Sequence, residues 1–149
     1  MLKEVSMKRR ISRENAFIAA FEESFDASSM SEIIHYSRET QEYAVDEFGE
    51  TMLRNLLAHR EEADKIIEPN LKDWKLNRLP RVCRIVLELA VTEMMYGEEG
   101  TSIVINEAVE IAKKFASDED YQFVNGVLGA IARAHFPEEQ GDSTCTRSE

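Results

Sequence analysis

Apolar side chains recur at every third or fourth position along most of this chain, which is the period of a helix that buries one face. The clearest case is Phe17, Phe21 and Phe25, which stand four residues apart and predict a helix from about Ile11 to Phe25. The other helices predicted in the first half cover residues 31–38, residues 43–59 with the stripe Phe48, Met52 and Leu56, and the stretch "EEADKIIEPN". No segment alternates as a strand would, so the pattern predicts an all-α protein.

The most apolar segment, "RVCRIVLELAVTEMMYG", follows a polar linker, "PNLKDWKLN". Asn77 is expected to cap this helix with Pro80 in its first turn, and Gly97 is expected to end it. Its predicted core residues are Val82, Ile85, Val86, Leu89 and Met94. Because the linker separates two groups of helices, we predict two small helical bundles packed together in one domain, residues 1–137. They cover about residues 8–68 and 71–136.

Two more helices are predicted after the loop "GEEG". Thr101 or Ser102 is expected to cap "IVINEAVEIAKKFA". The last helix is expected to open with a capping box, because Ser117 is followed three residues later by Asp120. The polar tail at residues 138–149 has no apolar period and is typical of disorder.

The last helix contains a contradiction, because "YQFVNGVLGAIAR" holds an Asn-Gly pair, a strong turn signal, inside a helical stripe. We interpret the stretch as a helix. Glycine inside a helix lowers the stability by about 1 kcal/mol relative to alanine, so we expect these glycines to have a structural role. Our hypothesis is that Gly126 and Gly129 let a neighbouring helix approach closely, and that Asn125 forms a hydrogen bond across that contact.

Charge is distributed unevenly along the 149 residues, whose net charge is −11. Residues 1–13 hold five basic side chains against one glutamate, a local charge of +4, so the remaining residues carry −15. A basic pole on an acidic body would confine a polyanion to one place, and the acidic remainder suits a basic protein partner. No apolar run is long enough for a membrane span or a signal peptide, so we expect a soluble cytoplasmic protein that does not act at a membrane.

Two segments are candidates for nucleic-acid binding. "KRRISR" places basic residues at the expected first turn of a helix, where backbone N–H groups and arginine side chains suit a phosphate, although a frayed, solvated terminus explains it equally well. "KKFASDEDYQF" interleaves Lys113 and Lys114 with Phe115, Tyr121 and Phe123, as in a platform for single-stranded RNA. The alternative for these rings is a place in the core, with the acidic residues complementing the helix dipole.

No signature of catalysis or of a cofactor site appears in the sequence, so an enzyme is not predicted. The carboxylates Glu88, Glu93, Glu107 and Glu110 lack the Glu-x-x-His pairs of di-metal bundles, and Glu32 with His35 is the single such pair. Cys83 and Cys145 lie too far apart in the sequence, and too far from other ligands, to indicate a disulfide or a zinc site. We therefore expect no metal and no cofactor.

Four stretches together resemble one known family. "INEAVEIAKKF", "YQFVNGVLGAIA" and "LNRLPRVCRIVLELAVTEM" resemble signature stretches of the NusB transcription antitermination and termination factors, and "KRRISRENAFIAAFEESF" resembles their arginine-rich first helix. The resemblance covers roughly residues 7–134. It implies an all-helical fold of two small bundles and a scaffolding role in transcription without catalysis.

The resemblance also implies ligands and partners. Members of this family bind single-stranded boxA-type RNA of ribosomal RNA operon transcripts together with the ribosomal protein NusE. The complex joins RNA polymerase and other Nus factors and prevents premature termination. The RNA-binding residues that it implies here are Lys8, Arg9, Arg10, Arg13, Phe115, Asp118, Glu119, Tyr121, Gln122 and Phe123.

The NusE-facing surface that the resemblance implies contains Arg81, Cys83 and Arg84. The resemblance implies an acidic residue at the position of Cys83, so we expect this chain to lack one charge contact to a basic partner. Two other functions keep the same fold. One is a protein–protein adaptor that does not bind RNA, and the other is a remnant of a ribosomal RNA cytosine methyltransferase, some of which begin with a NusB-like domain.

Overall fold

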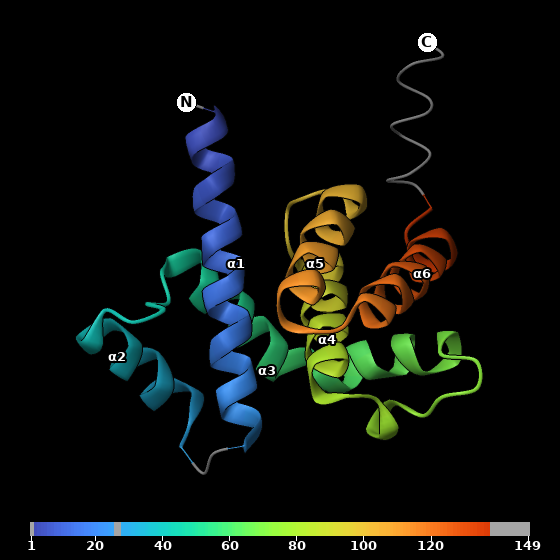
Figure 1. The fold of residues 1–149 in the computed structure, drawn as a ribbon, viewed down its shortest axis with the longest axis horizontal. Coiled ribbons are helices and arrows are strands. Elements are labelled where there is room, and N and C mark those ends of the chain that lie inside the picture. Colours follow the sequence, from blue (N-terminus) through green and yellow to red (C-terminus); the bar gives the residue numbers. More distant parts are fainter. Residues whose placement is uncertain (1, 26–27, 138–149) are drawn as a thin grey trace. The chain divides into compact units, whose positions relative to one another are not determined.

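The computed structural model describes residues 2–25 and 28–137, with side chains from Lys8 onward, and this part of the chain contains helices and no strand (Figure 1). The α-helices are α1 (Leu2–Phe25), α2 (Met30–Thr40), α3 (Glu47–Ile67), α4 (Arg81–Tyr96), α5 (Thr101–Phe115) and α6 (Asp118–His135). Two short 3-10 helices, η1 (Glu68–Asn70) and η2 (Leu76–Arg78), lie between α3 and α4. The predicted all-α class is confirmed. The predicted disordered tail, residues 138–149, lies outside the described residues.

The chain forms two compact units that meet in the sequence between Ala58 and His59. This division falls within α3, at a kink where His59 leaves helical geometry with φ −128° and ψ 19°. This boundary lies earlier in the sequence than the linker at which we expected one. It could not be predicted, because no proline or glycine marks the kink. On the second unit, the His59 ring stacks on Tyr96 at 3.9 Å between centroids, and the Tyr96 hydroxyl donates a hydrogen bond to Glu62.

The first helix begins earlier than predicted. α1 starts at Leu2 rather than near Ile11, since residues 2–10 contain no helix breaker and several good helix formers. The basic residues from Lys8 to Arg13 therefore lie inside the helix and not at its first turn. Backbone N–H groups inside a helix are already bonded to carbonyl groups of the preceding turn. A phosphate site built from the free N–H groups of a helix end is thus not formed by these residues.

The first unit is closed by contacts between α1 and residues on either side of the α3 start. α1 packs against α2, and Phe17 is buried and stacks on Phe21. The Asp46 carboxylate accepts a hydrogen bond from the Gly49 N–H at 2.8 Å and another from the Ser12 hydroxyl of α1. A Cβ atom on Gly49 would lie 3.2 Å from Val45 Cγ1 and 3.5 Å from the carbonyl oxygen of Ser12. Gly49, which the sequence analysis did not single out, therefore lies where the backbone of α1 comes close.

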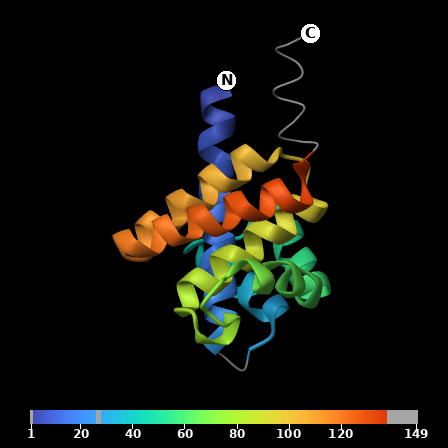
Figure 2. The same ribbon diagram turned by 90° about the vertical axis from the view of Figure 1, so that its right-hand side faces the viewer.

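The second unit is built around α4, which packs against α5 and α6 (Figure 2). Most of α4 is buried, including four of its five predicted core residues, while Val82 is half-buried. The predicted cap Asn77 is wrong: it lies in η2, and Pro80 precedes α4. Gly97 ends α4 as predicted.

Of the two helix caps predicted for α5 and α6, only the one for α6 is present. Gly100 precedes α5 without a side-chain cap, so the predicted capping by Thr101 or Ser102 is wrong. Both residues already lie within α5, and Thr101 is buried. Ser117 caps α6 in the predicted capping box, with its hydroxyl accepting from the Asp120 N–H at 3.2 Å.

The Asn-Gly pair lies in a helix, as interpreted, but our hypothesis about its packing is wrong. Asn125 and Gly126 are exposed on α6, and a Cβ atom on Gly126 would meet nothing within 4 Å. The nearest neighbour of a Cβ atom on Gly129 would be the Arg133 side chain at 3.4 Å. The helix packs through its other face, formed by Val124, Leu128 and Ile131.

A group of charged side chains is partly buried between α3 and α4 in the second unit. Glu88 is only 2% exposed. Its two carboxylate oxygens lie 3.4 Å from Arg60 Nε and 3.3 Å from Arg84 Nε. Burial and a hydrogen bond with Asp64 raise the pKa of Glu88 to about 7, although both arginines act in the opposite direction.

Candidate nucleic-acid interface

The basic segment of α1 presents two kinds of side chain. Lys8 and Arg10 are exposed, and Arg9 is half-buried, with its guanidinium carbon 3.9 Å from the centroid of the Phe48 ring. Arg13 is 4% exposed and lies 5.1 Å from the same ring. An arginine over an aromatic face is held by a cation–π attraction. Phe48 therefore holds Arg9 and Arg13, while Lys8 and Arg10 are presented to solvent.

This arrangement divides the roles expected of the four basic residues. Lys8 and Arg10 are two residues apart, so they point to different sides of α1, and both side chains are exposed to solvent. Arg9 reaches solvent in part. Arg13 is buried, so its guanidinium supports the packing of α1 against Phe48 more directly than it serves a ligand. Phe48 was predicted only as part of a core stripe.

The second segment lies at the turn between α5 and α6, in the second unit. Its three rings, Phe115, Tyr121 and Phe123, are half-buried and do not belong to the buried core. Lys113 Nζ lies 5.2 Å from the centroid of the Tyr121 ring, and Lys114 Nζ lies 5.8 Å from that of Phe115. Ring faces combined with nearby ammonium groups suit the stacking of bases and the neutralisation of phosphates.

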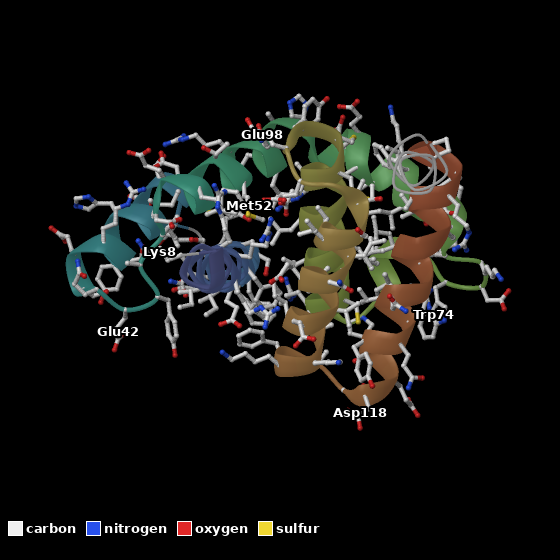
Figure 3. The ribbon with its side chains drawn as sticks, turned by 90° about the horizontal axis from the view of Figure 1, so that it is seen from above. Lys8, Glu42, Met52, Trp74, Glu98 and Asp118 are labelled. Carbon is white, nitrogen blue, oxygen red and sulfur yellow. The ribbon has the colours of Figure 1, made fainter. Side chains whose placement is uncertain are left out.

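The acidic residues of this turn have a structural role. Asp118 and Glu119 are exposed in the first turn of α6, where carboxylates complement the positive end of the helix dipole (Figure 3). Gln122 follows one turn later and is exposed. It supplies both a donor and an acceptor group, which is what reading a base edge requires.

The three residues expected to face a protein partner are not equally accessible. Arg81 is exposed and Arg84 is half-buried beside Glu88. Cys83 is 0% exposed. Burial and the neighbouring Asp120 carboxylate, with which the thiol forms a hydrogen bond, raise the pKa of Cys83 to about 12. The thiol is therefore protonated and inert, and it links α4 to the first turn of α6 instead of facing outward.

The described residues contain no group of three or more His, Cys, Asp and Glu side chains that could hold a metal ion. Glu32, from the Glu-x-x-His pair, accepts a hydrogen bond from the Ser29 N–H at 2.9 Å in a capping box of α2. None of the described helices is long and apolar enough to cross a membrane.

Comparison with known proteins identifies the family of this chain. The model of the NusB family matches residues 10–133. This chain belongs to the NusB family. A transcription antitermination protein NusB from Bacillus subtilis is 37% identical over 126 residues, covering 84% of this chain and 95% of the relative.

Two solved NusB structures share the fold. NusB from T. maritima has a TM-score of 0.76 and 31% identity, over 90% of this chain and 96% of its own. A crystal structure of the antitermination factors NusB and NusE in complex with double-stranded RNA contains a chain with a TM-score of 0.76 and 27% identity. That match covers 85% of this chain and 97% of the other.

The residues that sequence reasoning missed are those that position others. Asp46 and Gly49 fix α1 beside α3, and Phe48 holds Arg9 and Arg13. Asp120 was expected only as a capping residue, but it also faces Cys83. These contacts join residues distant in sequence, so no local spacing signals them.

Proposed function

We propose that this protein is a non-enzymatic, RNA-binding transcription antitermination factor. It binds boxA-type single-stranded RNA of ribosomal RNA operon transcripts together with the ribosomal protein NusE. Through RNA polymerase and other Nus factors, in the cytoplasm, it keeps these operons from terminating early. The observation that carries this proposal is the NusB family match over residues 10–133, which includes the whole second candidate segment and the first from Arg10 onward.

The two segments supply complementary contacts in this proposal. Lys8 and Arg10, with Arg9 beside them, bind phosphates, while Arg13 positions α1 through Phe48. Tyr121, Phe115 and Phe123 offer rings to bases, and Gln122 hydrogen-bonds a base edge. The relative crystallised with NusE held double-stranded RNA. Here the aromatic rings favour a single strand, whose unstacked bases are free to stack on them.

The partner surface follows from the same reasoning. Arg81 and Arg84 at the start of α4 contact NusE, and the buried Cys83 supports this end of the helix without touching the partner. The acidic body attracts a basic ribosomal protein over longer distances. Exposed Asp118 and Glu119 face the RNA at the start of α6, where their carboxylates accept hydrogen bonds from base amino groups.

Fluorescence anisotropy of a labelled boxA-like RNA tests the proposal. The RNA is titrated with this protein, with and without NusE, at low and high salt. A scrambled single strand and a duplex of the same sequence are the controls. Binding that prefers the boxA-like strand, tightens with NusE and weakens with salt is expected.

Equal binding of all three RNAs, or binding of none, with NusE present would overturn the proposed recognition of boxA-type RNA. The protein would then be an adaptor that keeps the NusB fold. A pull-down with NusE alone identifies that outcome, since an adaptor retains the partner without RNA.

A further inference from the structure

The linker between α3 and α4 carries an exposed aromatic side chain among basic residues. Trp74 is the single tryptophan of the chain. Its side chain is large and apolar, yet it is 52% exposed. Lys72, Lys75 and Arg78 lie within four residues of it, against one acid, Asp73. Together, Asp73, Trp74, Lys75 and Arg78 line an open pocket of about 480 Å³.

The position of Trp74 is fixed by its neighbours in the chain. Leu71, Leu76 and Leu79 are buried and anchor the linker on both sides of the tryptophan. The Trp74 N–H donates to the Leu71 carbonyl at 3.3 Å, and the Arg78 N–H donates to the Lys75 carbonyl at 2.9 Å. The linker is therefore an ordered turn that buries its leucines and presents its tryptophan. Burying an indole ring would stabilise the fold more than exposing it does, so packing of the core does not explain why Trp74 is exposed.

The linker lies beside the helix that carries the second RNA-binding segment. η1 packs against α6, and Figure 2 shows the linker below the first half of α6. Figure 3 shows Trp74 on the side of α6 and Asp118 at its start. All of these residues belong to the second unit. A strand that stacks on Tyr121 can thus continue along α6 toward the linker.

We propose that Trp74, Lys75 and Arg78 form an additional binding site for single-stranded RNA, beyond the boxA-type segment. The site rests on the proposed function, since it binds nucleotides that flank the same RNA. The Trp74 ring stacks on one base, and Lys75 and Arg78 neutralise adjacent phosphates. A flat indole ring is sequence-tolerant as a stacking surface, so this site adds affinity without a strong preference for one base. Its local positive charge, on a protein of net charge −11, favours a polyanion.

The test compares a short boxA-like RNA with the same RNA lengthened by about six nucleotides at either end, which is within the usual footprint of single-strand sites. Wild-type protein is expected to bind one of the long RNAs about ten-fold more tightly than the short one. Trp74→Ala and the pair Lys75→Gln with Arg78→Gln are expected to remove most of this gain and leave the short RNA unaffected. Trp74→Phe, which keeps a ring, is expected to retain part of it.

The control variant is Lys65→Gln, which removes one exposed positive charge from the second unit outside the linker. It is expected to leave the long-RNA gain intact. Circular dichroism melts of each variant check that the fold is retained. Since Trp74 is half-exposed, its replacement is expected to change the melting temperature little.

Three outcomes would overturn the site. The first is that the long RNAs bind no more tightly than the short one. The second is that Trp74→Ala weakens the binding of short and long RNA equally. The third is that Trp74→Ala weakens only the binding of NusE, which would make the linker a protein-binding surface. If the short RNA binds and the long ones gain nothing, only the additional site fails. If no RNA binds, the proposed function fails with it.

Discussion

The thiol of Cys83 on α4 is buried against the carboxylate of Asp120 in the first turn of α6. Asp120 also completes the capping box with Ser117. One carboxylate thus holds the start of α6 both to its own backbone and to α4. This contact gives a physical reason for a cysteine at a position where the family resemblance implied an acidic residue. A neutral thiol donates a hydrogen bond to Asp120, whereas a second carboxylate would repel it.

Replacing Cys83 by Asp is expected to destabilise the protein by about 3 kcal/mol at pH 7, because it places an uncompensated charge in the core beside Asp120. Lowering the pH should reduce the cost, since burial and Asp120 raise the pKa of the new carboxyl and favour its neutral form. Urea unfolding at pH 7 and pH 5 measures both effects. Cys83→Ser is the control, because it keeps a neutral donor. Equal stability of the Asp and Ser variants would contradict this packing.

The helices and the capping box of α6 were predictable, because they depend on residues three or four positions apart. Ser117 and Asp120 are such a pair. The caps at Asn77 and Thr101 failed because Pro80 and Gly100 take the positions before α4 and α5. The hypothesis that Gly126 packs against a neighbouring helix was wrong, because residue spacing shows that a helix has two faces but not which neighbour covers each face. The exposure of Arg10 and the burial of Arg13 could not be predicted, since Phe48 belongs to another helix.

Stability is expected to fall as the pH rises through the titration of Glu88. Its pKa is raised from 4.5 to about 7 in the folded protein. The folded state therefore holds a proton that the unfolded chain releases at lower pH. The stabilisation is fully present below about pH 4.5 and is lost as the pH passes about 7. We expect a decline on the order of 2 kcal/mol between pH 5 and 8 from this group.

The Glu88→Gln variant tests this assignment, because an amide keeps the size of the side chain and does not titrate. Its stability, measured by urea unfolding between pH 5 and 8, is expected to depend on pH less steeply than that of the wild type. Glu61→Gln is the matched control, since Glu61 is exposed on α3. An unchanged pH profile in Glu88→Gln would show that another group is responsible.

The two glycines Gly49 and Gly126 are expected to respond to alanine in opposite directions. At Gly126 the new methyl group meets open space, so alanine should stabilise α6 by about 0.5–1 kcal/mol through its better helix propensity. At Gly49 the methyl group lies 3.3 Å from Asp46 Oδ1 and close to buried Val45. We expect a loss of about 1 kcal/mol there, because the Val45 and Asp46 side chains must shift to make room. Thermal unfolding of both variants measures the difference, and a loss at Gly126 would show that its exposed face packs.

The basic residues of α1 are expected to separate into ligand contacts and supports. The double variant of Lys8→Gln and Arg10→Gln should bind boxA-like RNA more weakly and lower the salt-dependence slope by about 1.4, or roughly 0.7 for each phosphate contact. Its melting temperature should stay close to that of the wild type, because both side chains are exposed.

Arg13→Gln should do the opposite. It loses the contact with Phe48 in a buried position and is expected to destabilise the fold by about 1 kcal/mol, with the salt slope unchanged. RNA titrations over a series of salt concentrations, paired with thermal melts, distinguish the two roles. A slope lowered as much by Arg13→Gln as by a single exposed substitution would show that Arg13 leaves Phe48 to bind phosphate. The packing of α1 would then change when RNA binds.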